Sequence, residues 1–147
     1  MRIEELEATC REAAAELVQR GRPVPASVVL PQTDATRVVG LPEFPEDDAA
    51  RFTLLSEFAE DEMRPGNIPC YGFIAEAAAT ADDGVVDVVV VVYGARGHHP
   101  QITAAPLTAG GLEAFSDAEE LDPRAMPFLA PLQHAADAAQ PPDVMGR

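Results

Sequence analysis

An unbroken run of five valines, Val88–Val92, limits the possible folds of this 147-residue chain more than any other feature. Valine is β-branched, and this branching favours an extended backbone over a helix. The run shows no alternation of polar and apolar residues, which is typical of a strand that is covered on both faces. We therefore predict a central strand over Val85–Tyr93, with other elements packed on each side of its sheet.

The segments on either side of this strand predict two antiparallel neighbours. Asp82-Asp83-Gly84 is a hairpin turn signal, so the run Cys70–Ala79 before it should pair with the valine strand. Gly97-His98-His99-Pro100 turns the chain again, toward a further strand over Gln101–Leu107. Pro106 in that last strand indicates a position at the edge of the sheet, because proline has no N–H for a strand ladder.

The remaining elements are three helices and two short strands. Residues 3–20 form an amphipathic pattern in which apolar positions recur every three or four residues: Ile3, Leu6, Cys10, Ala13 and Leu17. Short strands follow at 26–30 and 36–41, and a second helix begins near Pro45. A last helix is predicted over Phe128–Ala139.

This order, α-β-β-α-β-β-β-α, predicts an α+β fold with a mainly antiparallel sheet of about five strands. We expect a single domain over residues 1–139, followed by a frayed C-terminal tail over 140–147 that contains Pro141-Pro142.

The charge balance excludes several classes of partner. Asp and Glu number 25 against 10 basic residues, all of them Arg, which gives a net charge of −15. DNA, RNA and anionic lipid surfaces should repel such a protein, and the lack of Trp argues against base-stacking platforms. The acidity has three interpretations: the composition of the host, a surface for a basic protein partner, or a mimic of nucleic-acid phosphates. Because the acids are scattered, host composition is favoured.

The two cysteines, Cys10 and Cys70, are too few for a disulfide framework. No Cys or His spacing is typical of zinc, and no motif indicates a cofactor, so we predict neither. The charged N-terminus lacks the apolar core of a signal peptide. We therefore expect a cytoplasmic protein.

Four residues are weak candidates for chemistry. His98 and His99 could supply a general base or metal ligands, while Arg96 could hold an anion. Cys70 could act as a nucleophile if a histidine reached it. No family signature surrounds any of them, and a polar hairpin loop is the favoured explanation of the histidines.

Two acids interrupt the apolar strands, Glu76 and Asp87. A two-residue turn at Asp83-Gly84 would place Glu76 opposite Val91, and would keep the two carboxylates apart. We expect Glu76 to face solvent or to pair with an arginine, because an unpaired buried carboxylate is costly.

The leading hypothesis is a non-enzymatic interaction or accessory protein, binding a partner protein or itself as a homodimer. It rests on the charge density, on the lack of catalytic motifs and on a possible spare apolar face of the first helix. One alternative is a small hydrolase or ligand-binding enzyme that uses Arg96, His98 and His99. A second alternative is a nucleic-acid-mimicking inhibitor of a basic protein.

Overall fold

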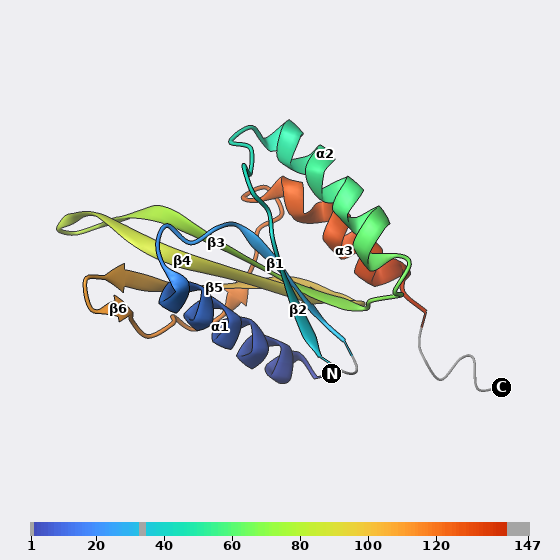
Figure 1. Ribbon diagram of the computed structural model, residues 1–147, viewed down its shortest axis with the longest axis horizontal. Coiled ribbons are helices and arrows are strands. Elements are labelled where there is room, and N and C mark those ends of the chain that lie inside the picture. Colours follow the sequence, from blue (N-terminus) through green and yellow to red (C-terminus); the bar gives the residue numbers. More distant parts are fainter. Residues whose placement is uncertain (1, 33–34, 141–147) are drawn as a thin grey trace.

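A strongly curled antiparallel sheet lies between one helix on one face and two helices on the other (Figure 1). The computed structural model describes residues 2–32 and 35–140. The predicted α+β class and single domain are confirmed. Of the predicted tail, residues 141–147 lie outside the described residues, while Gln140 exchanges two hydrogen bonds with the side chain of Asn67.

The element order matches the prediction apart from two very short strands. The helices are α1 (Ile3–Arg20), α2 (Asp48–Phe58) and α3 (Ala130–Ala138), with a π-helical turn at Ala59–Met63 and a 3-10 turn at Pro127–Leu129. The strands are β1 (Ser27–Pro31), β2 (Thr36–Gly40), β3 (Cys70–Ala81), β4 (Gly84–Ala95), β5 (His98–Thr108), β6 (Gly111–Leu112) and β7 (Glu119–Glu120). The two-residue strands β6 and β7 bring the sheet to seven strands, against about five predicted.

The strands lie in the order β2-β1-β3-β4-β5-β6, and β7 also pairs with β5. The prediction that Pro106 marks an edge is only partly right. β5 has neighbours on both sides, but on the side away from β4 they are only the two-residue strands β6 and β7. The carbonyl of Pro106 accepts the N–H of Glu113, 2.9 Å away, on the side that faces away from β4. The nitrogen of Pro106 faces the same side, so the proline removes no ladder bond to β4.

Helix α1 packs against one face of the sheet with its whole apolar stripe. Leu6, Cys10 and Ala14 are at most 1% exposed, and they contact strand residues such as Val89 and Val91. The spare apolar face that motivated a homodimer through this helix is therefore occupied within the molecule. Among the described residues, no helix is both long and apolar enough to cross a membrane.

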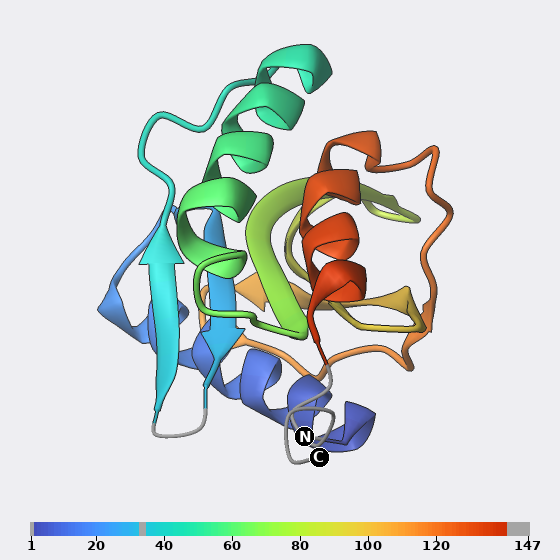
Figure 2. The same cartoon turned by 90° about the vertical axis from the view of Figure 1, so that its right-hand side faces the viewer.

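Helices α2 and α3 cover the opposite face of the sheet side by side (Figure 2). Phe73 of β3 contacts Phe44 and Phe128, with ring centroids 5.7 and 5.9 Å apart. The guanidinium of Arg51 in α2 lies 5.0 Å from the ring centroids of both Phe44 and Phe128. The aromatic rings thus join the loop before α2, the sheet and the turn before α3.

The predicted covering of the valine strand is confirmed only for its second half. Val89–Val92 are buried, but Val85 is 72% exposed and Val86 is 38% exposed. The end of the β3–β4 hairpin extends beyond the helices that cover the rest of the sheet (Figure 1). The prediction was wrong for this end because the sequence pattern does not show how far the covering helices reach.

The register of this hairpin also differs from the predicted one. Glu76 lies opposite Val89, two residues from the predicted partner Val91. The turn consists of Asp82-Asp83 instead of Asp83-Gly84, and Gly84 opens β4 with a φ of +120°. A shift of the turn by one residue moves the pairing by two.

Candidate functional site

The two histidines lie in a strand and not in the predicted loop. His98 and His99 are the first residues of β5, and the tight turn before them is Arg96-Gly97, where Gly97 has a φ of +75°. Both histidine side chains are exposed. Both line a surface pocket of about 490 Å³, a volume within the range of small-molecule sites.

Three segments that are distant in the sequence form this pocket. The first turns of α1 supply Glu4 and Glu7, the end of β4 supplies Tyr93, and the segment of β7 supplies Glu120. Glu7 pairs with Arg11 one helical turn later, and Arg11 also donates to the carbonyl of Ser116, 3.3 Å away. These contacts hold α1 against the segment that leads into β7.

Tyr93 is the most buried polar group of the pocket, at 2% exposed. Burial, followed by a hydrogen bond to Glu7 and the charge of that carboxylate, raises the pKa of Tyr93 to about 12 from an ordinary value of 10. The raised pKa keeps the phenol protonated into the alkaline range, where an ordinary tyrosine would ionise.

The other two candidates, Arg96 and Cys70, do not line the pocket. The Arg96 guanidinium donates to the carbonyl of Ala139, 3.1 Å away, at the end of α3. Cys70 is buried against α1, and this burial raises the pKa of its thiol. A thiol with a raised pKa forms little thiolate, which is the reactive species. The structure thus brings His98 and His99 together in one pocket and places Arg96 and Cys70 elsewhere.

A polar network from α3 fixes the turn that carries the histidines. The Gln133 amide donates to the carbonyl of Ala95 and to Asp137, at 2.9 and 3.0 Å, and Asp137 accepts the N–H of Gly97 at 3.0 Å. The hydroxyl of Tyr71 donates to Gln133 at 2.9 Å. Sequence reasoning missed both helix residues, although two polar residues four apart in an apolar helix are a recognisable signal.

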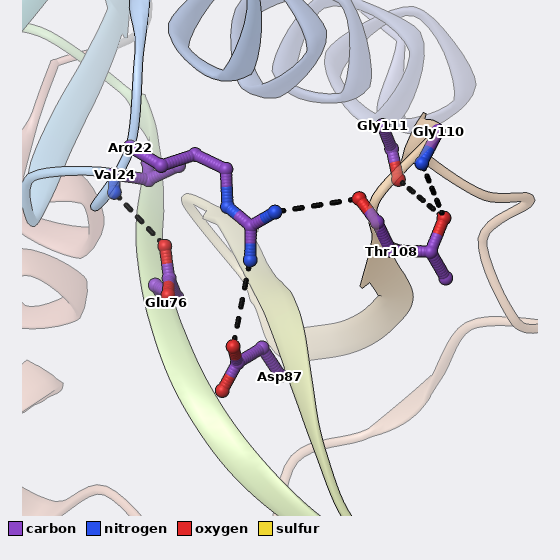
Figure 3. A network of polar contacts seen from close by, with 7 residues as sticks. All are labelled: Arg22, Val24, Glu76, Asp87, Thr108, Gly110 and Gly111. Carbon is purple, nitrogen blue, oxygen red and sulfur yellow. Dashed lines mark hydrogen bonds and ion pairs between the residues drawn. The ribbon is translucent and has the colours of Figure 1, made fainter.

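Glu76 and Asp87 hold the linker between α1 and β1 (Figure 3). Glu76 accepts the N–H of Val24 at 3.0 Å, and Arg22 reaches both Asp87 and the carbonyl of Thr108, at 3.4 and 3.3 Å. The sequence predicts that Glu76 faces solvent or pairs with an arginine. Instead, Glu76 accepts a backbone N–H, and Asp87 forms the ion pair with Arg22. Both acids thus attach the linker between α1 and β1 to the β3–β4 hairpin.

Replacing Tyr93 with phenylalanine should reduce the fall in the free energy of unfolding as the pH rises above about 10. Below pH 10 the phenol is protonated in both folded and unfolded chains, so its raised pKa does not change stability there. Between about pH 10 and pH 12 the unfolded chain ionises first, and stability falls by about 1 kcal/mol per pH unit. Urea unfolding followed by circular dichroism from pH 7 to 12 measures this slope. Identical slopes for Tyr93→Phe and the wild type would contradict the buried, protonated phenol.

The residues that line the pocket include groups that can bind a ligand through hydrogen bonds. Among the described residues, no group of three or more His, Cys, Asp or Glu side chains is placed to hold a metal ion. The pocket combines carboxylates, imidazoles and a phenol, which are hydrogen-bonding groups. No family model, no curated protein and no solved structure matches this chain.

Proposed function

We propose that this chain is a non-enzymatic interaction protein that binds a partner protein through an uncovered part of its sheet. The observation that carries the proposal is an apolar area on the side of the sheet that α2 and α3 cover elsewhere. We call this area the open sheet face; it consists of the exposed residues Ala77, Val86 and Pro106, the half-buried Ala79, and Val88 and Ala104, which border the α2/α3 core.

Strand register places these six residues on one face. Ala79 lies opposite Val86, and Val88 lies between Ala77 and Pro106 on the neighbouring strands. Residues directly opposite in an antiparallel pair share a face, and alternate residues along a strand do so as well. Phe73, Val90 and Val92 belong to the same faces of their strands and pack in the α2/α3 core. The open sheet face therefore continues that core surface and contains no charged residue.

The end of the hairpin lacks support from other strands. β1 reaches β3 only as far as Ile74, and β5 reaches β4 only from Val88 onward. Residues 77–81 and 84–87 thus pair only with each other. A two-stranded ribbon is marginally stable alone in water, and contiguous exposed apolar surface often marks a binding site. A partner that covered this face would stabilise the ribbon.

Charge complementarity indicates the chemistry of the partner. Asp82-Asp83 form the turn next to the open sheet face, and the acidic start of α2 lies on the same side of the sheet (Figure 1). A partner helix with an apolar stripe flanked by Lys and Arg would extend the α2/α3 layer and meet these acids. A second copy would bring its own net charge of −15 against the first.

Two neighbouring valines provide a matched test. Val86→Asp places a charge on the open sheet face, while Val85→Asp adds the same charge to the opposite face of the same strand. With a fluorescent amphipathic Leu/Lys helical peptide as the probe, we expect Val86→Asp to weaken binding at least tenfold relative to Val85→Asp. The two variants have the same net charge, so they attract the peptide equally at long range. A difference in peptide affinity between them, measured by fluorescence anisotropy, therefore reports contact with the open sheet face.

Equal weakening by both substitutions would contradict the proposal. Light scattering after size exclusion tests self-association: we expect a monomer of 15.6 kDa. If the wild type is a dimer and Val86→Asp is a monomer, the partner that covers the open sheet face is a second copy of this chain and not a basic protein. The homodimer, the enzyme that uses Arg96, His98 and His99, and the nucleic-acid mimic stay predictions from the sequence.

A further inference from the structure

The strand β2 leaves one edge of the sheet open. It pairs with β1 on one side, and in the described part of the chain it forms the margin of the sheet (Figure 2). Four of its five residues are exposed, among them Val38 at 38%. We propose that β2 binds an extended, basic segment of a partner protein as an additional antiparallel strand. No residue of β2 belongs to the open sheet face, so this site is independent of it.

The backbone groups of β2 point alternately to its two sides. The N–H of Leu41 donates to the carbonyl of Ala26 at 2.8 Å, so the alternate residues before Leu41 also bond to β1. Thr36, Val38 and Gly40 direct their N–H and C=O groups away from β1. These groups form no hydrogen bond with any other residue that the structure describes. They are the groups that an added strand would pair with.

The opposite edge of the sheet, by contrast, is covered by the chain itself. Beyond β5 the segment 111–121 contains β6 and β7, and between them the N–H of Ser116 donates to the carbonyl of Ala104 at 2.8 Å. Proteins usually cover a sheet edge or place free charges on it, because an open edge pairs with other chains. The only charged residue of β2, Arg37, already pairs with Glu62 at 2.8 Å. The edge at β2 therefore lacks the protection that the other edge has.

The side chains and the charge of the protein define the segment that fits this edge. Val38 lies opposite Val29, on the side of the sheet that α1 covers. A β-branched residue of the partner opposite Val38 would cover its exposed side chain, as cross-strand pairs do. The net charge of −15 attracts a segment that carries lysines and repels a second copy of this chain.

The probe is the peptide acetyl-Lys-Thr-Val-Thr-Val-Thr-Lys-amide. With a valine opposite Val38, antiparallel pairing directs the valine N–H groups to β2 and the threonine N–H groups to solvent. In calorimetric titrations at 0.15 M salt, methylation of both valine nitrogens should weaken binding at least about tenfold. Methylation of two threonine nitrogens is the matched control and should weaken it less than about threefold. Glutamates in place of both lysines should weaken it at least about tenfold.

Substitutions at one position of β2 test the same hydrogen bonds from the other side. Val38→Pro removes the N–H that faces the partner and leaves the bonds to β1 in place. Val38→Thr keeps this N–H and the β-branched shape, so it is the control. We expect the proline to weaken peptide binding at least about tenfold and the threonine less than about threefold.

Amide hydrogen exchange of the unaltered protein gives a readout that does not depend on a variant. Without peptide, the amides of Val38 and Gly40 should exchange fast, while those of Arg37 and Val39 are protected by β1. Saturating peptide should slow exchange at Val38 and Gly40 at least about tenfold and leave Arg37 and Val39 protected.

Four outcomes would overturn the proposal. Equal weakening by the two methylated peptides would show that the valine N–H groups are not used, and tight binding of the glutamate peptide would exclude a basic partner. Protection of Val38 that rises with protein concentration, without peptide, would assign the edge to a second copy. Binding that depends on Val86 and not on Val38 would place the peptide on the open sheet face. Because the Leu/Lys helical peptide is tested at Val86, either proposal can fail while the other holds.

Discussion

Gly72→Ala is expected to destabilise the protein by about 2–3 kcal/mol, because overpacking a dense core costs about that much. A Cβ at Gly72 would lie 2.3 Å from Sγ of Cys10 and 3.2 Å from Cβ of Val29. Both neighbours are fully buried between α1 and the sheet, so α1 must move away from β3 to make room. Urea unfolding followed by circular dichroism measures the change in the free energy of unfolding.

A second substitution identifies the cause of this loss. Cys10→Ala removes the nearest atom, so the closest neighbours of the new Cβ become Val29 Cβ at 3.2 Å and the Cβ of residue 10 at 3.6 Å. On this background Gly72→Ala should cost at least about 1 kcal/mol less than in the wild type, since residues in contact are coupled. Gly40→Ala is the control, because its Cβ would meet nothing within 4 Å. Strictly additive costs would contradict the steric explanation.

Phe73→Ala should lower the free energy of unfolding by about 3–5 kcal/mol, which is typical of a phenylalanine removed from a core. Phe73 is 1% exposed and contacts the rings of Phe44 and Phe128. Its loss leaves a cavity between the sheet and both covering helices, and it removes the ring that joins the other two to β3. Thermal and urea unfolding give the size of the loss.

Phe52 is the matched control for this substitution. Its side chain in α2 is 43% exposed against 1% for Phe73, so Phe52→Ala removes the same atoms with much less burial lost. We expect a cost of about 1 kcal/mol, well below that of Phe73→Ala, because the lost burial is only partial. Similar losses for Phe52→Ala and Phe73→Ala would mean that the aromatic contacts do not support the core as the structure indicates.

The parts of the fold that were predictable are those that local periodicity determines. The apolar spacing of the first helix gave its bounds, Ile3–Arg20, because a helix repeats every 3.6 residues regardless of its surroundings. The exposed hairpin end at Val85 and Val86 was not predictable in this way. Its exposure depends on where α2 and α3 end in space, and their own sequences carry no information about that. The strands β6 and β7 are too short to show any period.

The candidate site was predictable only in part, for a similar reason. The sequence pattern places His98 and His99 in the turn, whereas they open β5 next to it, and their surroundings come from distant segments. Glu7 and Glu120 are more than 100 residues apart in the chain, and only the packing of α1 and the pairing of β7 bring them to one pocket. No spacing rule in a single sequence joins such positions.

The two longest strands run without interruption from one end of the molecule to the other. Val86 on the open sheet face and Tyr93 in the pocket belong to the same strand, and seven residues at about 3.3 Å each separate them by roughly 23 Å. A protein bound at the open sheet face would therefore not cover the pocket at the other end of the strand. The fold thus keeps these two surfaces apart while it builds both on one continuous piece of backbone.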